Sequence, residues 1–255
     1  MLLTVPIGDA ELAADALWEA GTSAVEERPG PTADTVTLVA DAAPSSLLTG
    51  WALASAVVDD GLDTWREHAQ AWRAGPFTVR PPWLAASDGD GIDLVIDPGR
   101  AFGSGSHTST RLALAALAGV ARPGTSVLDV GCGSGVLAVA AALLGASRVD
   151  ATDVDPAALA ATAANAAANQ VAVHVGAPSG RYDVVVANIL AVMLVELAPQ
   201  LSAWGDVVVL SGLLVAQADA VAAAFSGHGV AARTEEDGWV ALVLHRVTER
   251  RPAVS

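Results

Sequence analysis

The chain is poor in the residues that build disulfide scaffolds and basic binding surfaces. It has one cysteine in 255 residues and no lysine, so all 13 basic residues are arginine, against 28 acidic residues. A single cysteine excludes a disulfide framework and suits a reducing cytoplasm. A formal charge of −15 argues against direct binding to nucleic-acid phosphates and is compatible with a basic protein as partner.

Long apolar runs and targeting signals are also missing. The first residues contain no basic region, which argues against a signal peptide. The longest apolar stretch, 184–195, is too short to span a bilayer and contains Asn188. The five histidines are scattered, without the spacing of a metal site. We therefore expect a cytoplasmic protein with neither a metal nor a membrane anchor. A monomer is favoured, although the sequence does not determine the oligomeric state.

The most informative segment is residues 127–135, VLDVGCGSG, where a short apolar strand enters a glycine-rich turn. Gly131, Gly133 and Gly135 allow the backbone to bend tightly and a ligand to approach closely. The apolar stretch 136–144 predicts a helix, whose first N–H groups would face the ligand. This pattern predicts a nucleotide-containing cofactor at the carboxyl end of a parallel strand.

The next predicted strand, 149–153, ends in a carboxylate. Asp153 follows Gly131 by about 20 residues, the spacing at which an acidic residue binds the ribose hydroxyls of a nucleotide. Asp155 and Pro156 come next, and they are typical of the start of a helix, with Asp155 as its N-cap.

The spacing of the glycines also distinguishes between cofactors. A dinucleotide fingerprint requires glycine at position 136, where the chain has Val136. The turn instead resembles the D-x-G-x-G-x-G pattern of S-adenosylmethionine-dependent methyltransferases, beginning at Asp129. Because this cofactor has no pyrophosphate, it does not require the third close glycine. Cys132, inside the turn, is expected to be a small packing residue rather than a nucleophile.

The order of predicted elements indicates two domains. The pattern of residues 1–60 predicts a small α+β domain of the ferredoxin-like type. Residues 61–90 are expected to form a Trp-rich linker. From residue 91 to 255, strands alternate with helices, which predicts a doubly wound, mostly parallel sheet of seven strands with helices on both faces. Strands are expected at 2–7, 22–27, 35–40, 92–97, 126–130, 149–153, 171–175, 183–188, 206–211, 229–236 and 239–245, and helices at 10–20, 110–120, 136–144 and 157–168, the last of them on the surface.

Three further segments carry a resemblance to a known family. DPGRAFGSGSHTST at 97–110, ANIL at 187–190 and LSGLL at 210–214 closely resemble the bacterial methyltransferases of ribosomal protein L11 (PrmA-type). The Trp-rich segment with its PPW at 81–83 is also similar. The resemblance covers about residues 60–245, whereas residues 1–60 match only in size and element order. It implies a class I, Rossmann-like methyltransferase domain and an N-terminal domain that recognises the substrate.

The resemblance also implies a set of site residues. It places S-adenosylmethionine against the following residues: Phe102, His107, Thr110, Asp129, Gly131, Gly133, Gly135, Asp153 and Asn188. For catalysis we expect the side-chain oxygen of Asn188 and the backbone carbonyl of Ile189 to accept N–H bonds from the incoming amine. The alternative for His107 is a hydrogen bond to its own loop, and for Asn188 a plain turn at the end of a strand.

Three functions stay open at this point. The first is methylation of lysine side chains, the N-terminal amine or both on ribosomal protein L11. The second is methylation of another protein lysine or a small amine, and the third is a non-catalytic cofactor-binding module. Two departures from the family bear on the choice: Ser104 stands where threonine is usual, and the short segment 176–181 offers no identifiable partner for the adenine.

Overall fold

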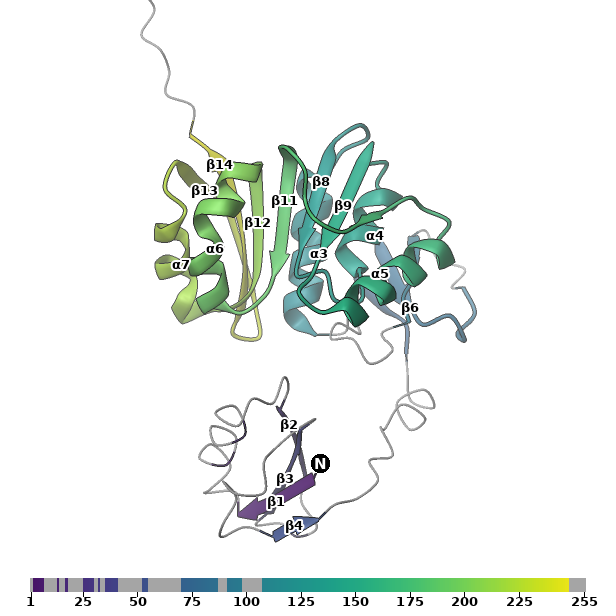
Figure 1. The fold of residues 1–255 in the computed structure, drawn as a ribbon, viewed down its shortest axis with the longest axis vertical. Coiled ribbons are helices and arrows are strands. Elements are labelled where there is room, and N and C mark those ends of the chain that lie inside the picture. The colour runs from purple at the N-terminus through teal and green to yellow at the C-terminus, as the bar shows by residue number, and fades with distance from the viewer. Residues whose placement is uncertain are drawn as a thin grey trace, which may run out of the picture. The chain divides into compact units, whose positions relative to one another are not determined.

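The computed structural model describes residues 2–6, 13, 17, 25–29, 32, 35–40, 52–54, 70–86, 91–97 and 107–247. The chain forms two compact units, Met1–His68 and Ala69–Ser255. Figure 1 shows the larger unit as a sheet with helices packed on both of its faces. Among the described residues, no helix is both long and apolar enough to cross a membrane.

The first unit contains an antiparallel sheet with the order β2-β3-β1-β4. Its strands are β1 (Leu2–Pro6), β2 (Val25–Pro29), β3 (Thr35–Ala40) and β4 (Ala52–Ala54). Alternate side chains of β1 and β3 are buried, as expected for strands with one covered face. The ferredoxin-like assignment stays a prediction, because most of the helical residues that it requires lie outside the described residues.

The second unit is built on a seven-stranded sheet with the order β10-β9-β8-β11-β12-β14-β13. The first five strands in this order run parallel, and β14 is antiparallel to both of its neighbours. The prediction of a doubly wound, mostly parallel sheet is therefore confirmed. The strands are β8 (Ser126–Val130), β9 (Arg148–Thr152), β10 (His174–Val175), β11 (Tyr182–Asn188), β12 (Gly205–Leu214), β13 (His228–Glu236) and β14 (Trp239–Arg246).

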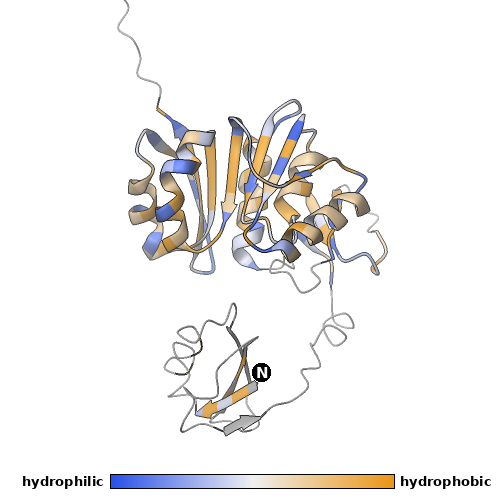
Figure 2. Cartoon of the chain, viewed as in Figure 1, coloured by the Kyte–Doolittle hydropathy of each residue, from blue (hydrophilic) through white to orange (hydrophobic). Residues whose placement is uncertain are grey.

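Two hydrophobic cores, one on each face, explain why the strand sequences are continuously apolar. Along β11, Val184 and Val186 pack into one core, and Val185 and Ala187 into the other. Figure 2 shows the resulting hydrophobic strands between the helices. The helices are α3 (Thr108–Val120), α4 (Val136–Leu143) and α5 (Pro156–Ala168) on the first face, and α6 (Ala191–Trp204), the short 3-10 helix η2 (Val215–Gln217) and α7 (Ala218–Ala224) on the second.

The strand predicted at 92–97 exists but lies outside the large sheet. It forms a separate three-stranded sheet with the order β5-β6-β7, from β5 (Trp72–Ala74), β6 (Phe77–Arg80) and β7 (Ile92–Val95). Part of the predicted Trp-rich linker is thus folded with the second unit, and Phe77 and Leu94 are fully buried in its core. The domain boundaries at residues 60 and 90 stay predictions.

Helix α5 has one exposed face, as expected for a surface helix. Asn165 on its buried face and Asn169, its C-cap, hold the segment around β7. The side chain of Asn165, which is 3% exposed, accepts a hydrogen bond from the Asp97 N–H (2.9 Å). It also donates to the Asp97 carbonyl (2.9 Å) and the Ser134 carbonyl (2.8 Å). One turn further on, Asn169 bonds the N–H and carbonyl of Val95 in the same way. The helix therefore fixes the start of the 97–110 segment and the glycine turn together.

This role of Asn165 can be tested by its removal. We expect Asn165→Ala to lower the free energy of unfolding by about 2–4 kcal/mol, because three hydrogen bonds of a buried amide are lost. Urea denaturation measures the change. As a control, Gln200→Ala, at an exposed position of α6, should stay within about 0.5 kcal/mol of the wild type. Equal stability of the two variants would contradict the anchoring role.

Candidate functional site

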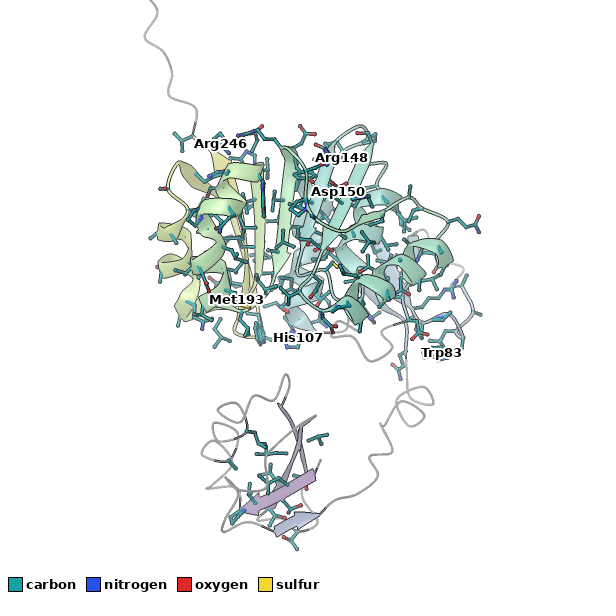
Figure 3. All side chains as sticks on the ribbon, viewed as in Figure 1. Trp83, His107, Arg148, Asp150, Met193 and Arg246 are labelled. Carbon is teal, nitrogen blue, oxygen red and sulfur yellow. The ribbon has the colours of Figure 1, made fainter. Side chains whose placement is uncertain are left out.

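Three neighbouring strands, β9, β8 and β11, end at one edge of the large sheet, and a predicted site residue follows or ends each of them. Val130, the last residue of β8, pairs with the last residue of β9 and with the next-to-last residue of β11. Gly131, Asp153 and Asn188 are therefore brought to the same edge. The strand order reverses between β8 and β11, which is where open α/β sheets bind ligands. Figure 3 shows His107 at this edge.

The turn after β8 has a backbone conformation that glycine adopts easily and other residues rarely do. The φ angles of Gly131, Gly133 and Gly135 are +72°, +53° and +79°. Space is also limiting: a Cβ on Gly131 would lie 2.4 Å from Cγ2 of Ile189, and one on Gly135 would lie 2.7 Å from Cγ2 of Thr162. The predicted glycines are thus required by the packing of this turn.

Asp153 stabilises the glycine turn through a hydrogen bond to its backbone. Its Oδ2 accepts a hydrogen bond from the N–H of Gly133 (3.0 Å), and its Oδ1 accepts one from the N–H of Asp155 (3.0 Å). Asp155 in turn caps α5 by accepting from the N–H of Ala157 (2.8 Å), which confirms the predicted N-cap. Each oxygen of the Asp153 carboxylate retains a further lone pair that can accept from a hydroxyl group. Binding of a ribose there stays a prediction.

Asp129 is a fully buried carboxyl group beneath the turn. Its Oδ2 accepts a hydrogen bond from the N–H of Ala138 (3.0 Å), whereas its Oδ1 has no partner in the described part of the chain. Burial raises the pKa of Asp129 to about 7; the Ala138 hydrogen bond opposes this rise, and the negative charge of Asp153 adds to it. A buried acceptor without a donor is costly. The site therefore fits a ligand with an ammonium group, such as the methionine part of S-adenosylmethionine.

Asn188 is held by Thr110. Its Nδ2 donates to Oγ1 of Thr110 at 3.2 Å, and its Oδ1 accepts no hydrogen bond from the described residues. The next carbonyl, that of Ile189, passes close to β12, because a Cβ on Gly212 (φ +80°) would lie only 2.4 Å from the Ile189 oxygen. Two carbonyl-type acceptors, one from the side chain and one from the backbone, thus follow one another at the end of β11.

His107 has a structural role that agrees with the local alternative. It is the N-cap of α3: its Nδ1 accepts from the N–H of Ser109 (3.2 Å) and lies 2.8 Å from the Ser109 Oγ. Its ring packs edge-on against Trp239, with 4.6 Å between the ring centroids. Whether His107 also covers a cofactor stays a prediction. Phe102, its expected partner in that role, lies outside the described residues.

Two residues at the site, Thr162 and Val154, were not predicted from the sequence. The hydroxyl of Thr162 lies within hydrogen-bond distance of the Gly133 carbonyl (3.1 Å) and of Sγ of Cys132 (3.2 Å), which share its one hydrogen. No local pattern marks a threonine inside a helix. Val154 is 93% exposed beside Asp153, and an apolar residue in an otherwise polar turn was a readable signal. Burial raises the pKa of Cys132 to about 12, which supports the packing role predicted for it.

Ser179, in the short connection 176–181, is hydrogen-bonded to residues at the amino ends of β9 and β11. The Ser179 carbonyl accepts a hydrogen bond from Arg148 (2.7 Å), and the Ser179 N–H donates to the hydroxyl of Tyr182 (2.9 Å). Because Arg148 and Tyr182 begin their parallel strands, Ser179 lies away from the edge that carries the glycine turn. In the part of the chain that the structure describes, no group of three or more His, Cys, Asp or Glu residues could hold a metal ion.

Comparison with known proteins finds one family that the chain matches over most of its length. The family model "Ribosomal protein L11 methyltransferase (PrmA)" matches residues 32–247. A protein of that name from Pseudomonas aeruginosa (strain LESB58) is 42% identical over 225 residues, which cover 82% of this chain and 75% of that protein. A relative of the same name from Thiobacillus denitrificans is 47% identical over 173 residues, covering 65% of this chain and 58% of the relative.

A solved structure is similar over about two thirds of the chain. The crystal structure of the ribosomal protein L11 methylase from Lactobacillus delbrueckii subsp. bulgaricus superposes with a TM-score of 0.62 and 31% sequence identity. The match covers 67% of this chain and 95% of the other.

The buried carboxyl predicts a distinctive pH dependence of stability. Since the pKa of Asp129 is about 7 in the folded chain and about 3.9 in an unfolded one, ionisation disfavours the folded state. The free energy of unfolding should therefore fall as pH rises from about 4 to 7, by roughly 1.4 kcal/mol for each unit of pKa shift. Urea denaturation across this range should show a flatter profile for Asp129→Asn. Parallel profiles for the two proteins would contradict the assignment.

Proposed function

Because the chain belongs to the ribosomal protein L11 methyltransferase (PrmA) family, we propose that it transfers methyl groups from S-adenosylmethionine to amino groups of ribosomal protein L11. The target amines are lysine side chains, the N-terminal amine or both. One observation carries the proposal: the glycine turn, the Asp153 carboxylate and the Asn188 side chain lie together at the carboxyl ends of β8, β9 and β11, where the strand order reverses.

The chain's own residues would hold the cofactor as follows. Asp153 would accept hydrogen bonds from the ribose hydroxyls. Oδ1 of Asp129, which has no partner among the described residues, would accept one from the ammonium group of the methionine part. The exposed side chain of Val154 covers the adenine. The remaining contacts come from the glycine turn and from the residues before and inside α3: Phe102, His107, Thr110, Gly131, Gly133 and Gly135. When bound, S-adenosylmethionine supplies a methyl group activated by a positively charged sulfur.

The residues at the end of β11 would orient the amine. Asn188 Oδ1 and the Ile189 carbonyl each accept an N–H, so that the nitrogen lone pair is directed at the methyl carbon. Thr110 keeps the amide in this orientation by accepting its N–H. The amine loses its proton to solvent before it attacks. Because positive charge develops on the nitrogen during transfer, two carbonyl dipoles that face it stabilise the transition state.

The charge of the chain supports a protein partner of this kind. At −15 it attracts a basic protein and repels bare nucleic acid. We place the reaction in the cytoplasm, where a chain with a single, buried cysteine meets no oxidising conditions.

The role of Asn188 predicts a selective loss of catalysis. Asn188→Ala should lower kcat for methylation of L11 by at least about 100-fold, since an acceptor aimed at the transition state is removed. The dissociation constant of S-adenosylmethionine should change much less than kcat, because Asn188 is only one of several expected cofactor contacts. Transfer of labelled methyl groups and titration calorimetry measure the two effects, with Gln200→Ala as a matched surface amide. Unaltered turnover would rule out the assigned role.

The role of Asp153 predicts a loss of cofactor binding. Asp153→Ala should weaken binding of S-adenosylmethionine by about 1–3 kcal/mol, because hydrogen bonds to a charged acceptor are lost. Asp155→Ala, which removes only the cap of α5, serves as the control and should retain nearly full affinity. A dissociation constant that is the same in Asp153→Ala and the wild type would refute the contact.

A further inference from the structure

The first two turns of α6 expose apolar side chains where a surface helix is normally polar. Leu190, Val192, Met193 and Val195 are 64%, 70%, 39% and 45% exposed. We refer to these four residues as the α6 patch. The inward side of the helix has its own buried contacts, so the α6 patch is not needed for the core. Neighbouring exposed apolar residues of this kind mark an interaction site.

Leu190 also occupies a helix position at which leucine is unfavourable. It is the N-cap of α6, with extended backbone angles and no side-chain hydrogen bond to the helix. Serine, threonine, aspartate and asparagine are strongly preferred at this position because they accept such a bond. A leucine here gives up helix stability and is also left exposed to water. Neither helix formation nor packing therefore explains it.

The α6 patch is continuous with the site proposed for the amine. Leu190 is two residues beyond Asn188, and Ile189 between them is fixed against Gly131 and Gly212. Figure 3 shows Met193 at the same edge of the sheet as His107. A chain segment that presents its amine to Asn188 must therefore pass next to the α6 patch.

One charge accompanies these apolar residues. Glu196 lies one turn after Val192, on the same side of the helix, and is exposed. It forms no ion pair with any residue that the structure describes. An apolar surface with a single unpaired carboxylate complements a segment that has an apolar side chain near a lysine or arginine.

We propose that the α6 patch and Glu196 bind the stretch of the protein substrate that flanks its target amine. An apolar side chain of that stretch packs on Leu190, Val192 and Met193, and a cationic one pairs with Glu196. This inference rests on the proposed function and deepens it, because it makes the enzyme selective for an amine within a polypeptide. A free small amine would gain nothing from these contacts.

Steady-state methylation of L11 tests the contact. The double variant Val192→Ser/Met193→Gln should raise KM for L11 about tenfold, with kcat and the dissociation constant of S-adenosylmethionine within about twofold of the wild type. Val230→Ser, at a 52% exposed valine of β13, is the matched control and should leave KM unchanged. Glu196→Gln should raise KM about threefold at low salt and have little effect at high salt.

The outcomes separate the two proposals. If the wild type methylates L11 and the double variant does so with the same KM, the docking role is wrong and the proposed function stands. If the wild type transfers no methyl group to L11, both are wrong. If sedimentation shows a wild-type dimer that the double variant turns into a monomer at unchanged KM, a second copy of the chain covers the α6 patch, and the docking role is again overturned.

Discussion

Ile189 packs closely against the backbone at Gly131 and at Gly212, and the rest of the site depends on this contact. Its side chain fills the space that a Cβ at Gly131 would need, and its carbonyl fills the space that a Cβ at Gly212 would need, each at 2.4 Å. The turn after β8 and the end of β12 can both approach it only because they have glycine there. As a result the neighbouring Asn188 is held at a fixed position relative to the glycine turn, which is the geometry that a transfer reaction requires.

Two buried aspartates of the large sheet, Asp150 and Asp129, differ in how their oxygens are hydrogen-bonded. Asp150, in the middle of β9, accepts hydrogen bonds on both oxygens: Oδ2 accepts from Arg148 (2.5 Å) and Tyr182 (2.6 Å), and Oδ1 accepts from Arg148 (3.2 Å). Burial alone would raise the pKa of Asp150, but these hydrogen bonds lower it below its ordinary value. At the site, by contrast, Oδ1 of Asp129 has no partner among the described residues. Asn188 donates to Thr110 through Nδ2, and its Oδ1 accepts no hydrogen bond from the described residues. Saturated groups stabilise the fold, whereas unsaturated ones are available to ligands.

The α6 patch is also energetically unfavourable in the chain by itself, but its groups are apolar. Leu190 occupies a cap position that a polar residue would stabilise, just as Asp129 carries a burial cost that a bound cation would relieve. Both features are unfavourable in the isolated chain and favourable in a complex. Such local conflicts are expected where function, rather than folding, selects the residue. The proposed cofactor side and the proposed substrate side of the site thus rest on the same kind of physical evidence.

Much of the architecture was determined by the sequence alone, because it depends on local rules. The spacing of glycines at 131–135, the Asp155 cap and the continuous apolar strands are all local patterns, and the structure has each of them as predicted. Only the tertiary structure decided which residues meet across long separations. Asn165 reaches Asp97 over 68 positions, β7 leaves the large sheet for a small one, and Gly212 makes room for Ile189. No periodicity or turn preference encodes such partners, because they form only when distant segments pack together.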